Sequence, residues 1–248
     1  DGENRAPLHL IFIEEPEAHM HAQLQQVFIR NVLDLMKETG EDATLFRSQT
    51  VVTTHSPHIL YERGFQPIRY FRRTNTDCEQ TTEVLNLSTF HNQNPKDRDF
   101  LQRYLKLTHC DLFFADAAIL VEGNVERLLL PVMIEQEAVS LRSACLSILE
   151  VGGAFAHRFK SLIEFLGLVA LVITDLDSVT LVADTLEEDE NEPTEFEVPN
   201  AENGQPPVSR AGKKCLASEP GALTSNQTLI QWLPKKQTIA ELFAATAA

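Results

Sequence analysis

Short apolar runs and amphipathic stretches alternate along most of the chain. Residues 8–13 are an apolar run with the length of a buried parallel strand. Residues 22–37 carry apolar side chains every three or four positions, which predicts a helix that buries one face. Residues 49–54 form a second strand-like run, and Ser56 followed by Pro57 is typical of a helix start. The chain is therefore expected to begin with strand, helix, strand.

The middle of the chain shows a different pattern. Residues 68–87 contain two strand-like runs around a polar turn, which predicts a hairpin. The polar residues 91–97 are expected to form a loop, and residues 100–107 a helix. We place a domain boundary near residues 108–115.

The second half of the chain returns to alternating strands and helices. Strands are expected at residues 117–121, 146–151 and 168–174, and helices at residues 125–137, 159–166 and after Lys236. Pro131 lies inside the first of these helices and is expected to disturb or kink it. Strands that alternate with helices predict an α/β fold with a parallel sheet and right-handed crossovers.

Composition narrows the class of protein. Apolar residues make up 43% of the chain, and no apolar run reaches the length of a membrane span, roughly 18 residues. The first residues lack the basic start and apolar stretch of a signal peptide. The four cysteines are far apart and never form C-x-x-C, so neither a disulfide framework nor a zinc site is expected, and a reducing cytoplasm fits.

The net charge of −15 argues against a nucleic-acid partner at first sight, because DNA binders usually present a basic patch. Nine acidic residues and no Lys or Arg lie between residues 184 and 202, which leaves a formal charge of −6 for the rest of the chain. Residues 184–205 contain few apolar side chains and are expected to form a surface insertion or mobile loop. The acidity is therefore concentrated and does not exclude DNA.

Carboxylates follow two of the expected strands directly. Glu122 ends one strand and Asp175 ends another, and parallel strands deliver such residues to the same edge of a sheet. Asp177 lies two residues further on. Glu126 falls in the first turn of the next helix, from which it can point back toward Glu122, and Gly123 relieves crowding where the chain reverses.

Four carboxylates in one crevice repel one another and need cations to remain ionised together. Oxygen ligands suit Mg²⁺ or Mn²⁺. Two such ions about 3.5–4 Å apart would clamp an in-line phosphoryl displacement, one activating the attacking water and the other steadying the leaving oxygen.

These residues resemble the Toprim domain. The resemblance rests on strand-E-G-x-x-E at residues 121–126 and on strand-D-x-D at residues 175–177, and it covers residues 115–180 best. Between them, Glu150 followed by Val151, Gly152 and Gly153 is similar to the middle strand and glycine turn of the family. The resemblance implies a Rossmann-like parallel sheet and a metal-dependent nuclease that uses Glu122, Glu126, Asp175 and Asp177, with Gly123, Gly152 and Gly153 as structural turn residues.

The N-terminal segment resembles the Walker B region of ABC-type ATPases. On this resemblance Glu14 would support Mg²⁺, Glu15 would polarise the attacking water and His55 would be the switch histidine. The sequence contains no G-x-x-x-x-G-K-[ST] phosphate loop and no Ser-Gly-Gly signature. We therefore expect the C-terminal part of a longer protein, which binds ATP only in its full-length form and does not hydrolyse it as this fragment.

An ATPase lobe followed by Toprim is similar to the overcoming-lysogenization-defect (OLD) family of ATP-dependent nucleases. The resemblance implies that the full-length protein is a homodimer that cleaves DNA in phage defence or DNA repair, with no membrane partner. The domains are expected at residues 1–75 (C-terminal portion of the ATPase), 76–113 (hairpin and helix connection) and 114–248 (Toprim).

Family members also use a further acid and a lysine after the D-x-D strand, the lysine stabilising the pentacovalent phosphate. Glu219 is the candidate acid, and Glu150 at a strand end is another. The lysine either lies beyond Ala248 or is one of four candidates, Lys213, Lys214, Lys235 and Lys236.

Several alternatives remain open. Residues 175–179 also resemble the nucleophile motif of haloacid-dehalogenase phosphatases, in which Asp175 would form an aspartyl phosphate and Asp177 would act as acid and base. That motif leaves the E-G-x-x-E unexplained. A topoisomerase would need a nucleophilic tyrosine in a recognisable motif, and a primase would bring a zinc module. A non-cleaving Toprim module would bind DNA without metal. His19 and His21 could hold zinc, although no third ligand has matching spacing.

Overall fold

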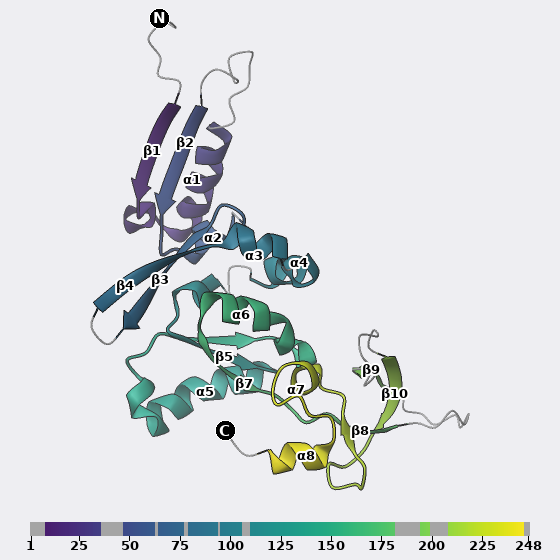
Figure 1. Ribbon diagram of the computed structural model, residues 1–248. Helices are drawn as coiled ribbons and strands as arrows, with labels where there is room; N and C mark the ends of the chain where they lie inside the picture. The colour runs from purple at the N-terminus through teal and green to yellow at the C-terminus, as the bar shows by residue number, and fades with distance from the viewer. Residues whose placement is uncertain are drawn as a thin grey trace, which may run out of the picture. The chain divides into compact units, whose positions relative to one another are not determined.

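The chain divides into two compact units, residues 1–115 and 116–248. The computed structural model (Figure 1) describes residues 8–35, 47–62, 64–76, 79–93, 95–105, 110–181, 194–198 and 208–245. Among these residues, no helix has both the length and the apolar character that crossing a membrane requires.

The first unit begins with the expected strand, helix, strand. In chain order it contains β1 (Leu8–Glu14), η2 (Pro16–His19), α1 (Ala22–Leu35), β2 (Arg47–Thr53), α2 (Pro57–Tyr61), β3 (Arg69–Thr76), β4 (Glu79–Asn86), α3 (Leu87–Gln93), α4 (Pro95–Tyr104) and η4 (Cys110–Phe114). β1 and β2 pair in parallel, with Leu8 opposite Arg47 and Glu14 opposite Thr53. Ser56 caps α2 by accepting the His58 N–H, and Pro57 is its first residue, as predicted.

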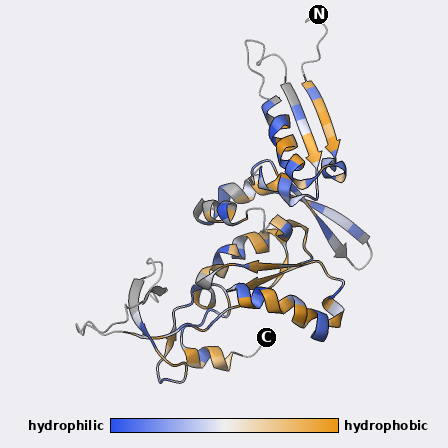
Figure 2. Cartoon of the chain, turned by 180° about the vertical axis from the view of Figure 1, so that it is seen from behind, coloured by the Kyte–Doolittle hydropathy of each residue, from blue (hydrophilic) through white to orange (hydrophobic). Residues whose placement is uncertain are grey.

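β1 is not buried, although its apolar run predicts a buried strand. The exposed fraction is 53% at Leu10 and 73% at Phe12. The strand pairs only with β2, so much of its surface has no cover within the described residues. Figure 2 shows this strand as mostly apolar.

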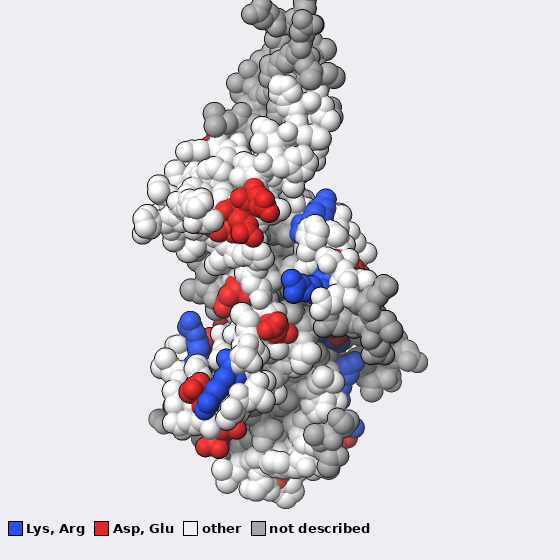
Figure 3. Space-filling view, turned by 90° about the vertical axis from the view of Figure 1, so that its left-hand side faces the viewer, with Lys and Arg blue, Asp and Glu red and all other residues white. Residues whose placement is uncertain are grey.

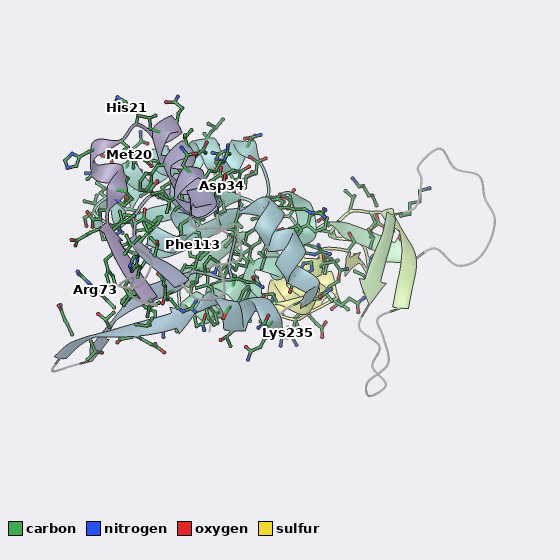
Figure 4. All side chains as sticks on the ribbon, turned by 90° about the horizontal axis from the view of Figure 1, so that it is seen from above. Met20, His21, Asp34, Arg73, Phe113 and Lys235 are labelled. Atoms are coloured by element: carbon green, nitrogen blue, oxygen red, sulfur yellow. The ribbon has the colours of Figure 1, made fainter. Side chains whose placement is uncertain are left out.

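Residues 91–97, expected as a loop, are mostly helical. α3 ends at Gln93 and α4 begins at Pro95, which is favoured at the first position of a helix. Apolar residues that pack into the core lie on either side of this polar segment: Phe90 and Leu101 are both almost fully buried. Phe113, labelled in Figure 4, packs edge-on against Phe65 with ring centroids 6.4 Å apart.

The second unit contains the expected α/β alternation and a further sheet. In chain order its elements are β5 (Ala117–Val121), α5 (Asn124–Glu137), η5 (Val139–Leu141), β6 (Leu146–Glu150), η6 (Gly153–Phe159), α6 (Lys160–Leu166), β7 (Val169–Ile173), β8 (Ser178–Leu181), β9 (Thr194–Val198), β10 (Val208–Lys214), β11 (Leu223–Thr224), α7 (Gln227–Gln231) and α8 (Ile239–Ala244).

The parallel sheet has the strand order β6-β5-β7, which confirms the predicted fold class. Central strand β5 is the most buried, with Leu120 and Val121 fully enclosed. Figure 1 shows α5 and α6 on opposite sides of this sheet. Leu162 and Leu166 of α6 are fully buried.

α5 continues through Pro131, so the predicted disturbance does not end the helix. A proline removes the hydrogen bond to the carbonyl four residues earlier, here that of Arg127. Pro131 and Arg127 are both exposed, so water can satisfy that carbonyl. The apolar stripe of α5 also faces outward: Val125, Leu128, Leu129, Val132 and Met133 are each more than half exposed.

An antiparallel sheet with the order β11-β8-β10-β9 follows the parallel one and was not predicted. β9 lies inside the acidic stretch that was expected to be an insertion or mobile loop, so part of that stretch is a strand paired with β10. The remaining residues of the stretch, 184–193 and 199–205, lie outside the described residues. α8 confirms the helix expected after Lys236.

The burial of β5 gives a test of the fold. Leu120 is fully buried and Leu128 is 72% exposed. We expect Leu120→Ala to lower the free energy of unfolding by about 3 kcal/mol through lost apolar burial and the cavity left behind. The same change at Leu128 should alter it by less than about 0.5 kcal/mol. Urea unfolding of both variants checks this, and equal losses would contradict the assignment of β5 to the core.

Candidate metal centre

Glu122 lies at the carboxyl edge of the parallel sheet, immediately after central strand β5. The preceding residue, Val121, pairs with Glu150 of β6 on one side and with Ile173 of β7 on the other. The three strands therefore end at the same level. Whatever follows β5 and β7 meets at this edge, as the sequence predicts.

The Glu122 carboxylate joins the ends of β5 and β7. Its Oε2 accepts hydrogen bonds from the Thr174 hydroxyl at 2.9 Å and from the Asp175 N–H at 3.0 Å. Among the described residues, its Oε1 accepts no hydrogen bond. Glu122 thus lies beside the backbone of the D-x-D segment, with one oxygen left for another ligand.

Asp177 is held in a turn with an unusual backbone conformation. Its φ is 44°, in the left-handed region that aspartate tolerates better than most residues. Its carbonyl oxygen accepts hydrogen bonds from the N–H and the hydroxyl of Ser225, at 3.0 and 3.1 Å. Its carboxylate Oδ2 accepts one from the Asn226 side chain at 3.2 Å. Contacts from distant residues therefore hold the D-x-D turn.

The surroundings of Asp177 at this edge, including neighbouring carboxylates, shift its pKa. Burial raises the pKa of Asp177 above its ordinary value, and the negative charges of Glu122 and Asp175 raise it further. The hydrogen bond from Asn226 and the charge of Lys214 act in the opposite direction. A divalent cation bound at this edge would reduce the repulsion.

Glu126 and Gly123 form a local turn beside these groups. Glu126 is the third residue of α5, and its carboxylate accepts the Gly123 N–H at 3.1 Å, so it points back along the chain as predicted. The φ of Gly123 is −139°, an ordinary extended value. Glycine is favoured there by space, since an added Cβ would lie 3.3 Å from the Glu126 carboxylate. Gly152, by contrast, has a φ of 60°. Gly153 begins η6.

The structure brings some of the predicted site residues together and leaves others apart. Within the described part of the chain, no three His, Cys, Asp or Glu side chains converge closely enough to hold a metal ion. Glu122, Asp175 and Asp177 lie at the same edge of the sheet, and their all-oxygen donor set suits Mg²⁺ or Mn²⁺. Glu150 instead forms an ion pair with Arg127 at 3.8 Å, and Glu219 accepts the Leu216 N–H at 3.0 Å.

Two residues of this edge were missed by sequence reasoning. Thr174 donates to Glu122, and Asn226 donates to Thr174 and Asp177. Asn226 directly precedes α7 and caps it, so an Asn before a short helical pattern was a detectable signal. The contacts of Asn226 with Thr174 and Asp177 depend on which loop lies next to it in the fold, and local sequence does not specify that.

The ATPase-like residues of the first unit also come together. Glu15 has a φ of 38°, and its N–H donates to the Thr53 carbonyl at 3.0 Å, at the end of the paired strands. Its Oε1 lies 3.5 Å from Nε2 of His55. Glu14 is the last residue of β1, opposite Thr53. The carboxylate and the imidazole expected to flank a nucleotide phosphate are therefore neighbours.

Glu17 is a further residue of this group that sequence reasoning missed. Its carboxylate accepts the Thr54 hydroxyl at 2.9 Å and the His55 N–H at 2.6 Å. It therefore fixes the backbone that carries His55. His19 and His21, the alternative zinc ligands, are both exposed and join no metal-binding group among the described residues. His21 is labelled in Figure 4 beside Met20.

The charged side chains that the structure describes are mixed on one face of the molecule. On the face drawn in Figure 3, the described basic side chains stand in small groups among acidic ones. Any DNA contact on this face therefore relies on a few basic side chains rather than on a broad positive field.

Two family models match the chain. Residues 113–177 match the model described as "Overcoming lysogenization defect protein-like, TOPRIM domain". That range contains Glu122, Glu126, Asp175 and Asp177. Residues 1–60 match the model described as "AAA ATPase domain", which contains Glu14, Glu15 and His55.

Relatives that match the chain carry nuclease names. It is 30% identical to "Endonuclease GajA" of Bacillus cereus (strain HuB5-5), over 95% of the chain and 32% of that protein. It is 25% identical to "OLD nuclease" of Thermus scotoductus (strain ATCC 700910 / SA-01), over 58% of the chain and 26% of that protein. A second "Endonuclease GajA", from Bacillus cereus (strain VD045), is 25% identical over 68% of the chain and 26% of its own length. The chain thus spans about a third or less of the length of these relatives.

The raised pKa of Asp177 predicts an effect on stability in the absence of metal. Ionisation of Asp177 is disfavoured in the folded chain, so stability is lost as pH rises through its ordinary pKa toward the raised value. Asp177→Asn keeps an acceptor for Asn226 and removes the charge. With EDTA present, we expect the variant to melt higher than the parent at pH 7.

The same advantage should shrink below pH about 4, where Asp177 is protonated in the parent. Thermal unfolding of both proteins at the two pH values measures this difference. A variant that melts lower than the parent at pH 7 would contradict the repulsion described here.

Proposed function

Because this chain belongs to the overcoming-lysogenization-defect family through its TOPRIM domain, we propose that it hydrolyses DNA phosphodiester bonds with two divalent metal ions. The observation that supports this most directly is the Glu122 carboxylate, which spans the ends of β5 and β7 and lies against Asp175. It links Glu122 to the backbone of Asp175, which is 53 residues further along the chain.

In this proposal Glu122, Asp175 and Asp177 hold Mg²⁺ or Mn²⁺ through their carboxylate oxygens. When bound, two such ions activate a water molecule and stabilise the leaving oxygen of the phosphodiester. Glu126 is the fourth carboxylate, and its bond to the Gly123 N–H keeps it beside the site until a cation competes for it. The negative charges of these carboxylates attract a divalent cation.

Lys214 is the lysine we propose for stabilising the charge on the phosphate. Of the four lysine candidates, it is the one whose charge lowers the pKa of Asp177. It ends β10 and lies opposite Val179 of β8, the strand that follows the D-x-D turn. Lys213 is the neighbouring residue of the same strand, opposite Thr180, and so provides a matched control.

We further propose that the full-length protein couples this nuclease to ATP. Support comes from the proximity of Glu15 and His55, whose Oε1 and Nε2 atoms lie 3.5 Å apart. ATP would act only in the full-length protein, because this chain carries no phosphate-binding loop. A homodimer and a role in phage defence or DNA repair belong to the same proposal and rest on the family alone.

Plasmid cleavage tests the proposed activity. We expect the protein to nick or linearise supercoiled plasmid with Mg²⁺ or Mn²⁺ and to be inactive with EDTA. Glu122→Gln and Asp175→Asn should each lower the rate by at least about a hundredfold, since each removes a ligand that stabilises transition-state charge. Glu219→Gln is the control, because Glu219 bonds to its own turn, and it should retain the parent rate.

Metal-independent DNA binding without cleavage, in this chain and in the full-length protein, would instead show a non-cleaving Toprim module. A loss of activity in Glu219→Gln as large as in the other two variants would return Glu219 to the metal site, where the family resemblance places a further acid.

The pair Lys214→Met and Lys213→Met tests the lysine assignment. We expect Lys214→Met to lower kcat by about a hundredfold, because a positive charge aimed at developing negative charge is lost. Lys213→Met should change kcat by less than about threefold. Steady-state cleavage of a labelled duplex measures both, and equal effects would show that neither lysine has a specific role.

A further inference from the structure

The Asn226 side chain is fully buried and has every polar atom engaged. Its Oδ1 accepts the Thr228 N–H at 3.0 Å, which caps α7. Its Nδ2 donates to the Asp175 carbonyl oxygen at 3.0 Å. A backbone N–H can only donate and a carbonyl can only accept, so these two contacts fix which way round the amide lies. The cap accounts for Oδ1 alone and leaves the Nδ2 contacts to be explained.

Nδ2 of Asn226 also contacts Thr174, which is bonded to Glu122, and the side chain of Asp177. It donates to the Thr174 hydroxyl oxygen at 2.7 Å and to Oδ2 of Asp177 at 3.2 Å. The two N–H groups thus serve three acceptors, so one N–H is shared between two of them. The Thr174 hydroxyl uses its proton on Glu122, so it must act as acceptor toward Asn226. The amide is therefore linked to Glu122 through one hydroxyl and to Asp177 directly.

Thr224 and Ser225, which precede Asn226, also form hydrogen bonds with the D-x-D turn. Ser225 donates twice to the Asp177 carbonyl, and the Thr224 hydroxyl donates to the Leu176 carbonyl at 2.5 Å. Thr224 is itself fully buried. Three successive residues thus hold three successive residues of the D-x-D turn, and Asn226 is the member that extends this contact to Glu122.

The chemistry of the amide suits a site that must later take a cation. Glu122 and Asp177 carry like charges when both are ionised, so they repel one another. A lysine or arginine between them would hold them by neutralising their charge and would compete with a metal ion. A neutral amide donates hydrogen bonds and leaves the negative charge of the carboxylates available.

We propose that Asn226 is a positioning residue that fixes Glu122 and Asp177 relative to one another for metal binding. The metal-binding part of this inference rests on the proposed nuclease function, whereas the clamp itself is a property of the metal-free chain. If Asn226 only caps α7, any good capping residue can replace it. If Asn226 also holds Glu122 and Asp177, a capping residue that cannot reach them does not replace it.

Asn226→Ser separates the two roles, because serine caps a helix as well as asparagine but is too short to reach Thr174 and Asp177. Thr238→Ala is the matched control: it removes the cap of α8 in the same unit and leaves the D-x-D turn untouched. Two quantities are measured on the whole chain. Amide hydrogen exchange at Asp175 and Ser225 is followed by NMR with EDTA present, and Mn²⁺ affinity is followed by electron paramagnetic resonance.

We expect Asn226→Ser to speed exchange at both amides by at least about tenfold, because their acceptors lose their support. Its Mn²⁺ dissociation constant should rise by at least about tenfold, as is typical when a residue that orients a ligand is lost. Thr238→Ala should stay within about threefold of the parent in both quantities. Unchanged exchange and affinity in Asn226→Ser would overturn the inference and leave Asn226 as a cap.

The two proposals fail in different ways. A parent chain that protects Asp175 and Ser225 but binds no Mn²⁺ contradicts the proposed function, and with it the metal-positioning role. A parent that binds Mn²⁺ while Asn226→Ser binds it equally well contradicts only the inference.

Thr174→Val tests the link to Glu122 in a second way, since valine keeps the shape of threonine without its hydroxyl. If the Asn226 amide acts on Glu122 through Thr174, combining Asn226→Ser with Thr174→Val should weaken Mn²⁺ binding by less than the product of the two single-variant effects. Effects that multiply in full would show that the hydroxyl does not carry the contact.

Discussion

Repulsion between carboxylates at one edge of a parallel sheet is the constraint on which the second unit depends. Partial burial raises the pKa of Asp177 above its ordinary value, and the negative charge of Glu122 raises it further. Neutral hydrogen-bond donors hold the carboxylates together despite this repulsion: a hydroxyl, a side-chain amide and a backbone N–H. Such donors keep the group assembled and leave its charge available to a cation.

The remainder of the unit places these donors. The parallel register brings Thr174 and Asp175 level with Glu122 at the ends of β7 and β5. The antiparallel sheet then returns the chain, through β10 and β11, so that residues 224–226 meet the D-x-D turn. α7 begins at this point, and Asn226 serves both its cap and the turn. The second sheet thus positions the support for residues that the first sheet carries.

Much of this architecture could be predicted from local patterns. The strands around β5, the helix start at Ser56 and the two carboxylate motifs all follow from periodicity, caps and strand-end acids. The antiparallel sheet could not be predicted, because its strands are short and partly polar, and their pairing joins distant residues. Helices α3 and α4 were missed where polar side chains masked Phe90. The roles of Thr174 and Asn226 depend on tertiary contact, which one sequence alone does not specify.

The most direct test of the central claim is the position of bound metal. A crystal of the chain grown with Mn²⁺ and measured at the manganese absorption edge would locate the ions by anomalous scattering. We expect two peaks about 4 Å apart, contacted by Glu122, Asp175 and Asp177, with Asn226 still bonded to the D-x-D turn. Peaks at Glu219 or at His19 and His21, with none at this edge of the sheet, would contradict it.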